Sequence, residues 1–247
     1  MVVVAILGVL SSALVVSVRS GYKQARQANC KSNLRQFGVA LTIYRGEHDN
    51  RTPDWLSNLY PEYIDDRSMY VCRADNRDGR DAPVPGDYLR AIQDDDYNFY
   101  KNEETWDNKK NRSGDTRNTG IENCSYCYEF SVAPGVSMEW YSKTNPKIPL
   151  PENLTIKTIV DFKRVQLVYG DGNNVVDGIQ YPYSASRIPI VRCCHHWRDQ
   201  KLYGYKNSER TGGIQRLPIV INVAYAGNVF VSPPYWEGMI RPGESRD

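Results

Sequence analysis

The first eighteen residues, MVVVAILGVLSSALVVSV, contain no charged side chain, and a basic segment follows directly at Arg19. As an α-helix, eighteen residues would span about 27 Å, close to the roughly 30 Å hydrocarbon core of a bilayer. A cleaved signal peptide would carry its basic residues before the apolar run, whereas here they come after it. The order of the two segments therefore predicts a transmembrane helix rather than a signal peptide or a buried core helix.

The helical pattern continues beyond this uncharged run. Apolar residues recur at spacings of four, three, four and three, which is typical of one helical face: Cys30, Leu34, Phe37, Leu41 and Tyr44. Gly46, followed by HDNRTP, is a plausible end of the helix. We therefore expect one helix with a transmembrane or filament-core half at 1–18 and an amphipathic half at 19–46, joined to a globular body at 47–247.

Within the body, alternating or continuous apolar runs predict strands. These runs are SYCYEFSV at 125–132, VQLVYG at 165–170, IPIVRC at 188–193, PIVINVAY at 218–225 and NVFVS at 228–232. Ala226-Gly227 is a hairpin turn signal between the last two runs. A long polar excursion at 73–120, a proline-rich loop at 135–157 and a short helix ending near Ile64 complete the prediction. The fold class expected is α+β, with the long helix packed on an antiparallel sheet.

The composition excludes some functions. A net charge of +2 and a pI near 8.1 give no basic field of the kind that binds nucleic acid. Neither a nucleophile elbow nor a glycine-rich phosphate loop occurs, so we expect no enzyme and no cofactor. If the protein binds any cofactor, calcium is the candidate, because several aspartates could supply oxygen ligands: Asp65, Asp66, Asp94, Asp95, Asp96, Asp171 and Asp177. Their spacing does not fit a twelve-residue calcium loop, and such residues more simply form turns.

Several segments together carry a resemblance to a known family. The run VVVAILGVLSSALVVSVRSGYKQARQANCKSNLRQFGVALTIY aligns without a gap to the N-terminal helix of type IV pilins and type II secretion pseudopilins. It is most similar to the pseudopilin-like families of planctomycetes. MYVCRAD around Cys72, SYCYEFS, IPIVRCCHHW and INVAYAGNVFVSPPYWEG resemble further elements of those families. The chain thus resembles a pilin-like protein.

This resemblance implies a structural subunit anchored in the inner membrane by a single span, with its globular domain periplasmic or extracellular. Its expected partners are the membrane, other copies or pilin-like subunits, and secretion-system components, in a filament held together by helix packing. The glycine and glutamate of the prepilin processing region have no counterpart in this sequence. That difference favours an alternative, a membrane-tethered module that binds a polysaccharide or protein and does not polymerise.

Six cysteines in a domain outside the cytoplasm favour disulfides. Cys30 with Cys72 would tie the helix to the body, and the pair Cys124 and Cys127 would then bond to Cys193 and Cys194. The spacing Cys124-x-x-Cys127 together with Cys193-Cys194-His195-His196 also suggests zinc, with Cys124, Cys127, Cys193 and His195 as ligands. Four consecutive ligands cannot all face one side of a strand, so disulfides, zinc and free thiols all stay open. Catalysis by His195 or His196 is less favoured than a packed, hydrogen-bonded role.

Overall fold

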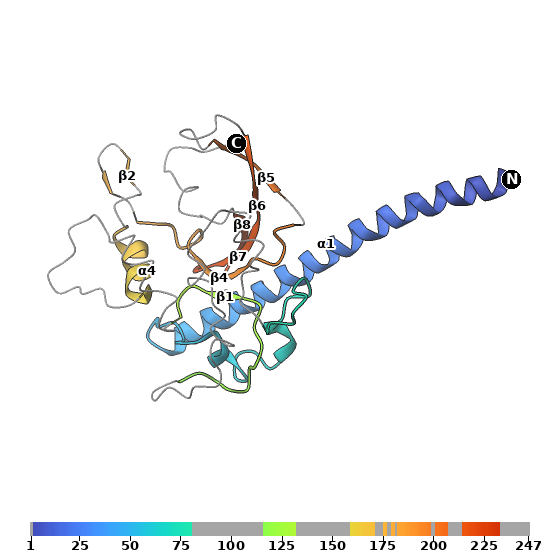
Figure 1. Ribbon diagram of the computed structural model, residues 1–247. Coiled ribbons are helices and arrows are strands. Elements are labelled where there is room, and N and C mark those ends of the chain that lie inside the picture. Colours follow the sequence, from blue (N-terminus) through green and yellow to red (C-terminus); the bar gives the residue numbers. More distant parts are fainter. Residues whose placement is uncertain are drawn as a thin grey trace.

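A computed structural model gives the fold (Figure 1). It describes residues 2–80, 116–131, 159–170, 175–176, 179–180, 182–198, 201–206 and 214–232. Side chains are described in these ranges except at 2–16, 159, 175–176, 179–180, 201–206 and 214–218.

The dominant element is helix α1, which runs unbroken from Val2 to Glu47. Its C-terminal half lies against the body, while its N-terminal half extends away from it (Figure 1). The expected apolar stripe faces the body, with Cys30, Leu34, Phe37 and Leu41 at most 1% exposed and Tyr44 partly buried. The helix ends at a turn where Asp49 and Asn50 adopt positive φ angles. The helix is thus continuous across the boundary predicted at residue 18.

An antiparallel sheet of four strands covers this stripe. Its strand order is β1-β4-β7-β8, formed by Cys127–Tyr128, Pro189–Cys193, Val220–Ala224 and Val229–Ser232. β7 and β8 form the hairpin expected around Ala226-Gly227. β4 and β7 are buried along their whole length, because α1 contacts both of them. The α+β class predicted from the sequence is confirmed.

One predicted strand is wrong. Residues 165–170 do not form a strand, since α4 (Ile159–Val168) continues through most of this run. Phe162, Lys163, Val165 and Gln166 are buried and form pairs three and four positions apart, as expected on one helical face. Lys163 and Gln166 share the buried face, and these polar residues conceal the helical apolar pattern in the sequence.

Short elements complete the described chain. Two 3₁₀ turns, η1 (Leu56–Leu59) and η2 (Arg67–Tyr70), lie in the segment after α1. η1 lies within the short helix expected to end near Ile64, and η2 follows that position. Two separate hairpins, not predicted from the sequence, pair β2 with β3 and β5 with β6. Their strands are Val175–Val176, Ile179–Gln180, Lys201–Lys206 and Ile214–Pro218. The predicted loop at 135–157 and most of the polar excursion, at 81–115, lie outside the described residues.

The membrane anchor predicted from the sequence needs correction. Among the residues that the structure describes, no helix combines the length and apolar character required to cross a bilayer. From Ser17 onward the described side chains of α1 include six basic residues, so this part of the helix offers no uncharged span of eighteen residues. Single-pass anchoring in the inner membrane is therefore not supported.

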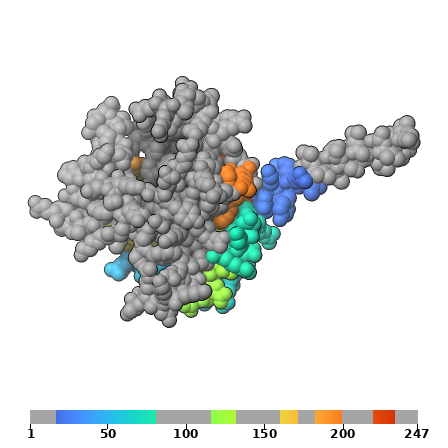
Figure 2. Space-filling model, viewed as in Figure 1, coloured from blue at the N-terminus to red at the C-terminus, as the bar shows by residue number. Residues whose placement is uncertain are grey.

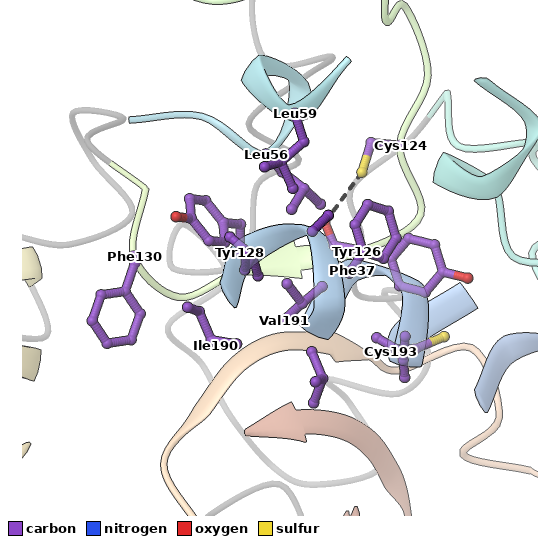
Figure 3. Close-up of a cluster of buried hydrophobic side chains, with 14 of the residues drawn as sticks. Phe37, Leu56, Leu59, Cys124, Tyr126, Tyr128, Phe130, Ile190, Val191 and Cys193 are labelled. Atoms are coloured by element: carbon purple, nitrogen blue, oxygen red, sulfur yellow. Dashed lines mark hydrogen bonds between the residues drawn. The ribbon is translucent and has the colours of Figure 1, made fainter. Parts of the chain in front are cut away.

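The hydrophobic core lies between α1, the sheet and the 3₁₀ segments (Figure 3). Phe37 projects from α1 into an aromatic cluster, with its ring centroid 5.2 Å from that of Tyr70 and 5.3 Å from that of Tyr126, both edge-to-face. Such aromatic pairs add about 0.5–1.5 kcal/mol beyond their buried area. Tyr128 joins this core and donates its hydroxyl proton to the Pro53 carbonyl oxygen at 2.8 Å. The core therefore fixes how the C-terminal half of α1 lies on the body.

Candidate metal centre

Three separate segments meet where α1 leaves the body. These are α1 itself, the turn after η2 and the turn after β4, drawn in blue, teal and orange in Figure 2. Each contributes ligand-type side chains: Cys30 from α1, Cys72 from the turn after η2, and Cys193 and His196 from the end of β4 and its following turn. We call these four residues the Cys₃His cluster.

The Cys₃His cluster is compact and closed. Its four ligand atoms all lie within 4.8 Å of one another, and Cys72 Sγ lies 3.4 Å from His196 Nε2. All four residues are 0% exposed. Three sulfurs and one imidazole nitrogen match the donors of a structural zinc site, and a site without solvent access leaves no open coordination position for catalysis.

Groups around the cluster hold the sulfurs in place. The Ala74 N–H donates to Cys72 Sγ at 3.4 Å, and the Tyr126 hydroxyl lies 4.0 Å from Cys30 Sγ in donor geometry. Asn33 fixes that hydroxyl, because its side-chain amide donates both to Tyr126 Oη and to the Met69 carbonyl oxygen at 3.2 Å. Hydrogen bonds of this kind orient ligands and offset the negative charge of thiolates.

The electrostatics favour an anionic sulfur at the centre of the cluster. Hydrogen bonds from the Cys193 and Cys30 thiols, together with that from His196, hold the pKa of Cys72 well below its ordinary value. Burial and the hydrogen bonds to Cys30 and Cys72 raise the pKa of Cys193. Cysteines that bind a cation do so as thiolates, so an environment that lowers the pKa of Cys72 also favours binding of a cation.

The other cysteines lie outside the cluster. Cys124 donates its thiol proton to the Tyr126 carbonyl oxygen at 3.5 Å (Figure 3). Cys127 lies on β1 opposite Arg192. Burial raises the pKa of the Cys194 thiol to about 12. All six cysteines are described and buried, and no disulfide joins any two of them, so the disulfides favoured by the sequence are not formed in this structure.

The zinc ligand set suggested by the sequence is only partly brought together. Of its four members, Cys193 belongs to the cluster, whereas Cys124, Cys127 and His195 do not. The neighbouring His196 occupies the place expected for His195. Cys30 and Cys72, predicted as a disulfide pair, are brought together, but as two members of a group of four.

His195 belongs to a different set of contacts. Its Nε2 lies 3.5 Å from Asp75 Oδ2, and that same oxygen accepts the Ser125 hydroxyl proton at 2.7 Å. Burial lowers the pKa of His195, which favours the neutral ring. A catalytic triad places the imidazole between the serine and the carboxylate, whereas here the carboxylate lies between the other two. Asp75 also accepts the backbone N–H groups of Arg77 and Gly79 at 2.9 Å, so it orders the turn.

The acidic residues considered for calcium do not form a described site. Asp66 is the N-cap of η2 and accepts from the Ser68 N–H at 2.8 Å and from its hydroxyl at 2.9 Å, which is a structural role. Asp94 to Asp96, Asp171 and Asp177 lie outside the described residues.

The sequence indicates that Cys30 and Cys72 are core residues, although their spacing matches no metal-binding motif. Cys30 occupies a position on the buried stripe of α1, and Cys72 closes a short apolar segment, so both are placed in the core by their neighbours. Their separation of 42 positions from each other, and of 121 from Cys72 to Cys193, exceeds any compact zinc motif. Only the packing of α1 on β4 brings the four residues together.

No family model, curated protein or solved structure matches this chain. The class that the fold and site define is therefore an α+β protein with a long N-terminal helix and a buried Cys₃His cluster. Assignment to pilins, a secretion system or a filament, which the sequence resemblance implied, has no support from these comparisons.

Proposed function

We propose that this protein is a non-enzymatic subunit that associates with other copies of itself through α1. The observation that carries the proposal is an exposed face on this helix that bears no charge between positions 17 and 46. Four of the six large hydrophobic side chains exposed among the described residues lie on α1: Val18, Tyr22, Val39 and Ile43, which are 62%, 63%, 61% and 48% exposed. The remaining two, Val168 and Tyr169, lie at the end of α4.

These four side chains share one side of the helix. At about 100° per residue they fall within an arc of about 100°, whose centre lies about 130° around the helix from the centre of the buried stripe. The six basic residues between positions 17 and 46 all project outside that arc: Arg19, Lys23, Arg26, Lys31, Arg35 and Arg45. We call this arc the outer face of α1.

The outer face suits contact with another helix. Gly21, Ala25 and Ser32 lie on the same arc, together with the uncharged polar residues Asn29 and Gln36, and a side chain added at Gly21 would meet nothing within 4 Å. Small residues between larger apolar ones let two helices approach closely. A second copy of α1 offers the same surface, which is uncharged from Ser17 to Gly46, so isologous pairing over these residues would bury no unpaired charge. Glu47, the last residue of α1, lies on the same arc, and its carboxylate accepts the Tyr63 hydroxyl proton at 2.6 Å.

Self-association was one part of the role expected from the sequence, and the proposal retains it. The proposal does not include the membrane anchor, the secretion system or the filament. The alternative of a binding module drew on the polar excursion, most of which lies outside the described residues. That alternative becomes the better account if the chain does not self-associate.

Analytical ultracentrifugation of the full chain tests this function. We expect concentration-dependent association, and a Val39→Glu/Ile43→Glu variant should weaken it at least tenfold, since two carboxylates would have to be buried at the contact. Val168→Glu is the matched control, because Val168 is 60% exposed but lies on α4. A chain that stays monomeric, or a control that weakens association equally, would contradict the proposal.

A further inference from the structure

We propose that Cys30, Cys72, Cys193 and His196 bind one zinc ion, which fastens α1 to the body of the protein. This inference is independent of self-association, because it concerns the buried side of α1 and not its outer face. It rests on geometry, on burial and on the number of thiols in the cluster.

The distances fit a tetrahedral ion. With zinc–sulfur bonds of about 2.3 Å and zinc–nitrogen bonds of about 2.0–2.1 Å, the edges of a tetrahedron are about 3.8 Å between sulfurs and about 3.5 Å between sulfur and nitrogen. The distance from Cys72 Sγ to His196 Nε2 is 3.4 Å, and no pair of ligand atoms is more than 4.8 Å apart. Small side-chain rotations suffice to complete the tetrahedron.

The number of thiols argues against a disulfide as the native state of the cluster. A disulfide between any two of Cys30, Cys72 and Cys193 would leave the third thiol and the His196 ring in the same buried space. A zinc ion engages all four groups. Three cysteines deprotonate on binding, and with Zn²⁺ they give a site of net charge −1, which the N–H of Ala74 and the hydroxyl of Tyr126 offset.

The position of the site defines its role. Cys30 is the first fully buried residue of α1 among those described, and the residues of α1 before it are exposed or only partly buried. Cys72 and the pair Cys193 and His196 come from two other parts of the body. The ion therefore joins three segments at the base of the projecting half of α1 and limits how that half can pivot. Because the site is closed, its role is structural.

The first experiment measures metal in the full chain purified without added metal or chelator. Native mass spectrometry and elemental analysis should give one zinc per chain. Replacement by Co²⁺ should produce the intense thiolate-to-cobalt bands and tetrahedral d–d bands of a sulfur-rich site. Iron as the bound metal, or a metal-free chain with a disulfide among Cys30, Cys72 and Cys193, would overturn the proposal.

Variants separate binding from folding. His196→Ala should lose the zinc, whereas His196→Cys should retain it, because a fourth thiolate can replace the imidazole. Cys124→Ser is the matched control: Cys124 is as buried as the ligands but lies outside the cluster, so full zinc content is expected. Loss of zinc in the Cys124→Ser variant while it remains folded would contradict the assigned ligand set.

Thiol labelling provides a readout that does not depend on variants. In the native chain we expect Cys30, Cys72 and Cys193 to resist alkylation until a chelator is added, and then to react at least tenfold faster. The rates at Cys124 and Cys194 should change much less. Equal acceleration at all buried thiols would indicate global unfolding instead of release of a bound ion.

Discussion

Gly38 of α1 packs directly against Gly227 in the turn between β7 and β8. A methyl group at position 38 would lie 2.7 Å from the Gly227 carbonyl oxygen and 2.8 Å from Val223 Cγ2. Gly227 has a φ of +92°, a conformation that other residues rarely adopt. The close approach of the helix to the hairpin therefore requires glycine at position 38, whereas the backbone conformation requires it at position 227, where an added Cβ would lie 3.6 Å from the Gly38 carbonyl oxygen.

This contact predicts opposite effects for two glycine-to-alanine substitutions in the same helix. Gly38→Ala should destabilise the fold by about 1–3 kcal/mol, because the added methyl group forces backbone atoms apart. Gly21→Ala should stabilise it by up to about 1 kcal/mol, since the site is open and alanine is the better helix former. Urea unfolding measures both. Similar effects of the two substitutions would contradict the close packing of α1 on the hairpin.

The aromatic cluster predicts a large loss of stability when Phe37 is truncated. Phe37→Ala should cost about 3–5 kcal/mol, because the cavity would remove contacts with Tyr70 and Tyr126. Val39→Ala, two positions along but 61% exposed, should change stability by about 0.5 kcal/mol or less. Denaturant midpoints compare the two. A small effect of Phe37→Ala would mean that α1 does not contribute to the core.

The buried carboxylate of Glu129 predicts a loss of stability in acid. Burial alone would raise its pKa, but Lys163 Nζ at 3.6 Å and Arg192 at 3.1 Å lower it below its ordinary value. A carboxyl group with a lower pKa in the folded than in the unfolded protein stabilises the fold above the unfolded value, about 4.3. That contribution is lost as the pH falls through the folded value. Glu129→Gln should therefore flatten the stability curve below about pH 4.3.

At neutral pH the same variant should be less stable by about 3–5 kcal/mol, because Lys163 and Arg192 lose the carboxylate between them. Urea unfolding at a series of pH values separates the two effects. Parallel curves for the variant and the unmodified chain would show that Glu129 does not account for the acid sensitivity.

Removing zinc should weaken the attachment of α1 to the body of the protein. If the Cys₃His cluster holds zinc, free zinc at about a hundredfold excess over its dissociation constant stabilises the fold by about 2.7 kcal/mol, and a chelator removes this contribution. Thermal unfolding with and without chelator measures the difference. Cys193→Ser should show no response to either zinc or chelator. An equal response in that variant would place the metal elsewhere.

Self-association through the outer face of α1 predicts little sensitivity to salt. The face carries no charge between positions 17 and 46, so raising the ionic strength should leave the association constant unchanged or increase it. Sedimentation at low and high salt concentration tests this. A steep decrease at high salt would instead indicate ion pairs from the basic residues on the other sides of the helix.

Local sequence patterns predicted much of the fold. The spacing from Cys30 to Leu41 identified the face of α1 that packs on the sheet, and the apolar runs identified β4 and the hairpin of β7 and β8. The prediction failed at α4, where Lys163 and Gln166 occupy buried positions. Lys163 tolerates burial because it pairs with Glu129 on a distant segment, and local periodicity contains no information about such a partner.

By itself, the sequence determined a long helix with one apolar stripe and an antiparallel sheet to cover it, because both depend on periodicities within a few neighbouring residues. The tertiary structure decided the rest. The Cys₃His cluster forms only because α1 packs on β4 and the turn after η2 places Cys72 beside Cys30 and His196. The outer face of α1 was likewise defined only once packing had fixed which side of the helix is buried. Contacts between distant segments depend on how whole elements pack, and local sequence patterns do not record that arrangement.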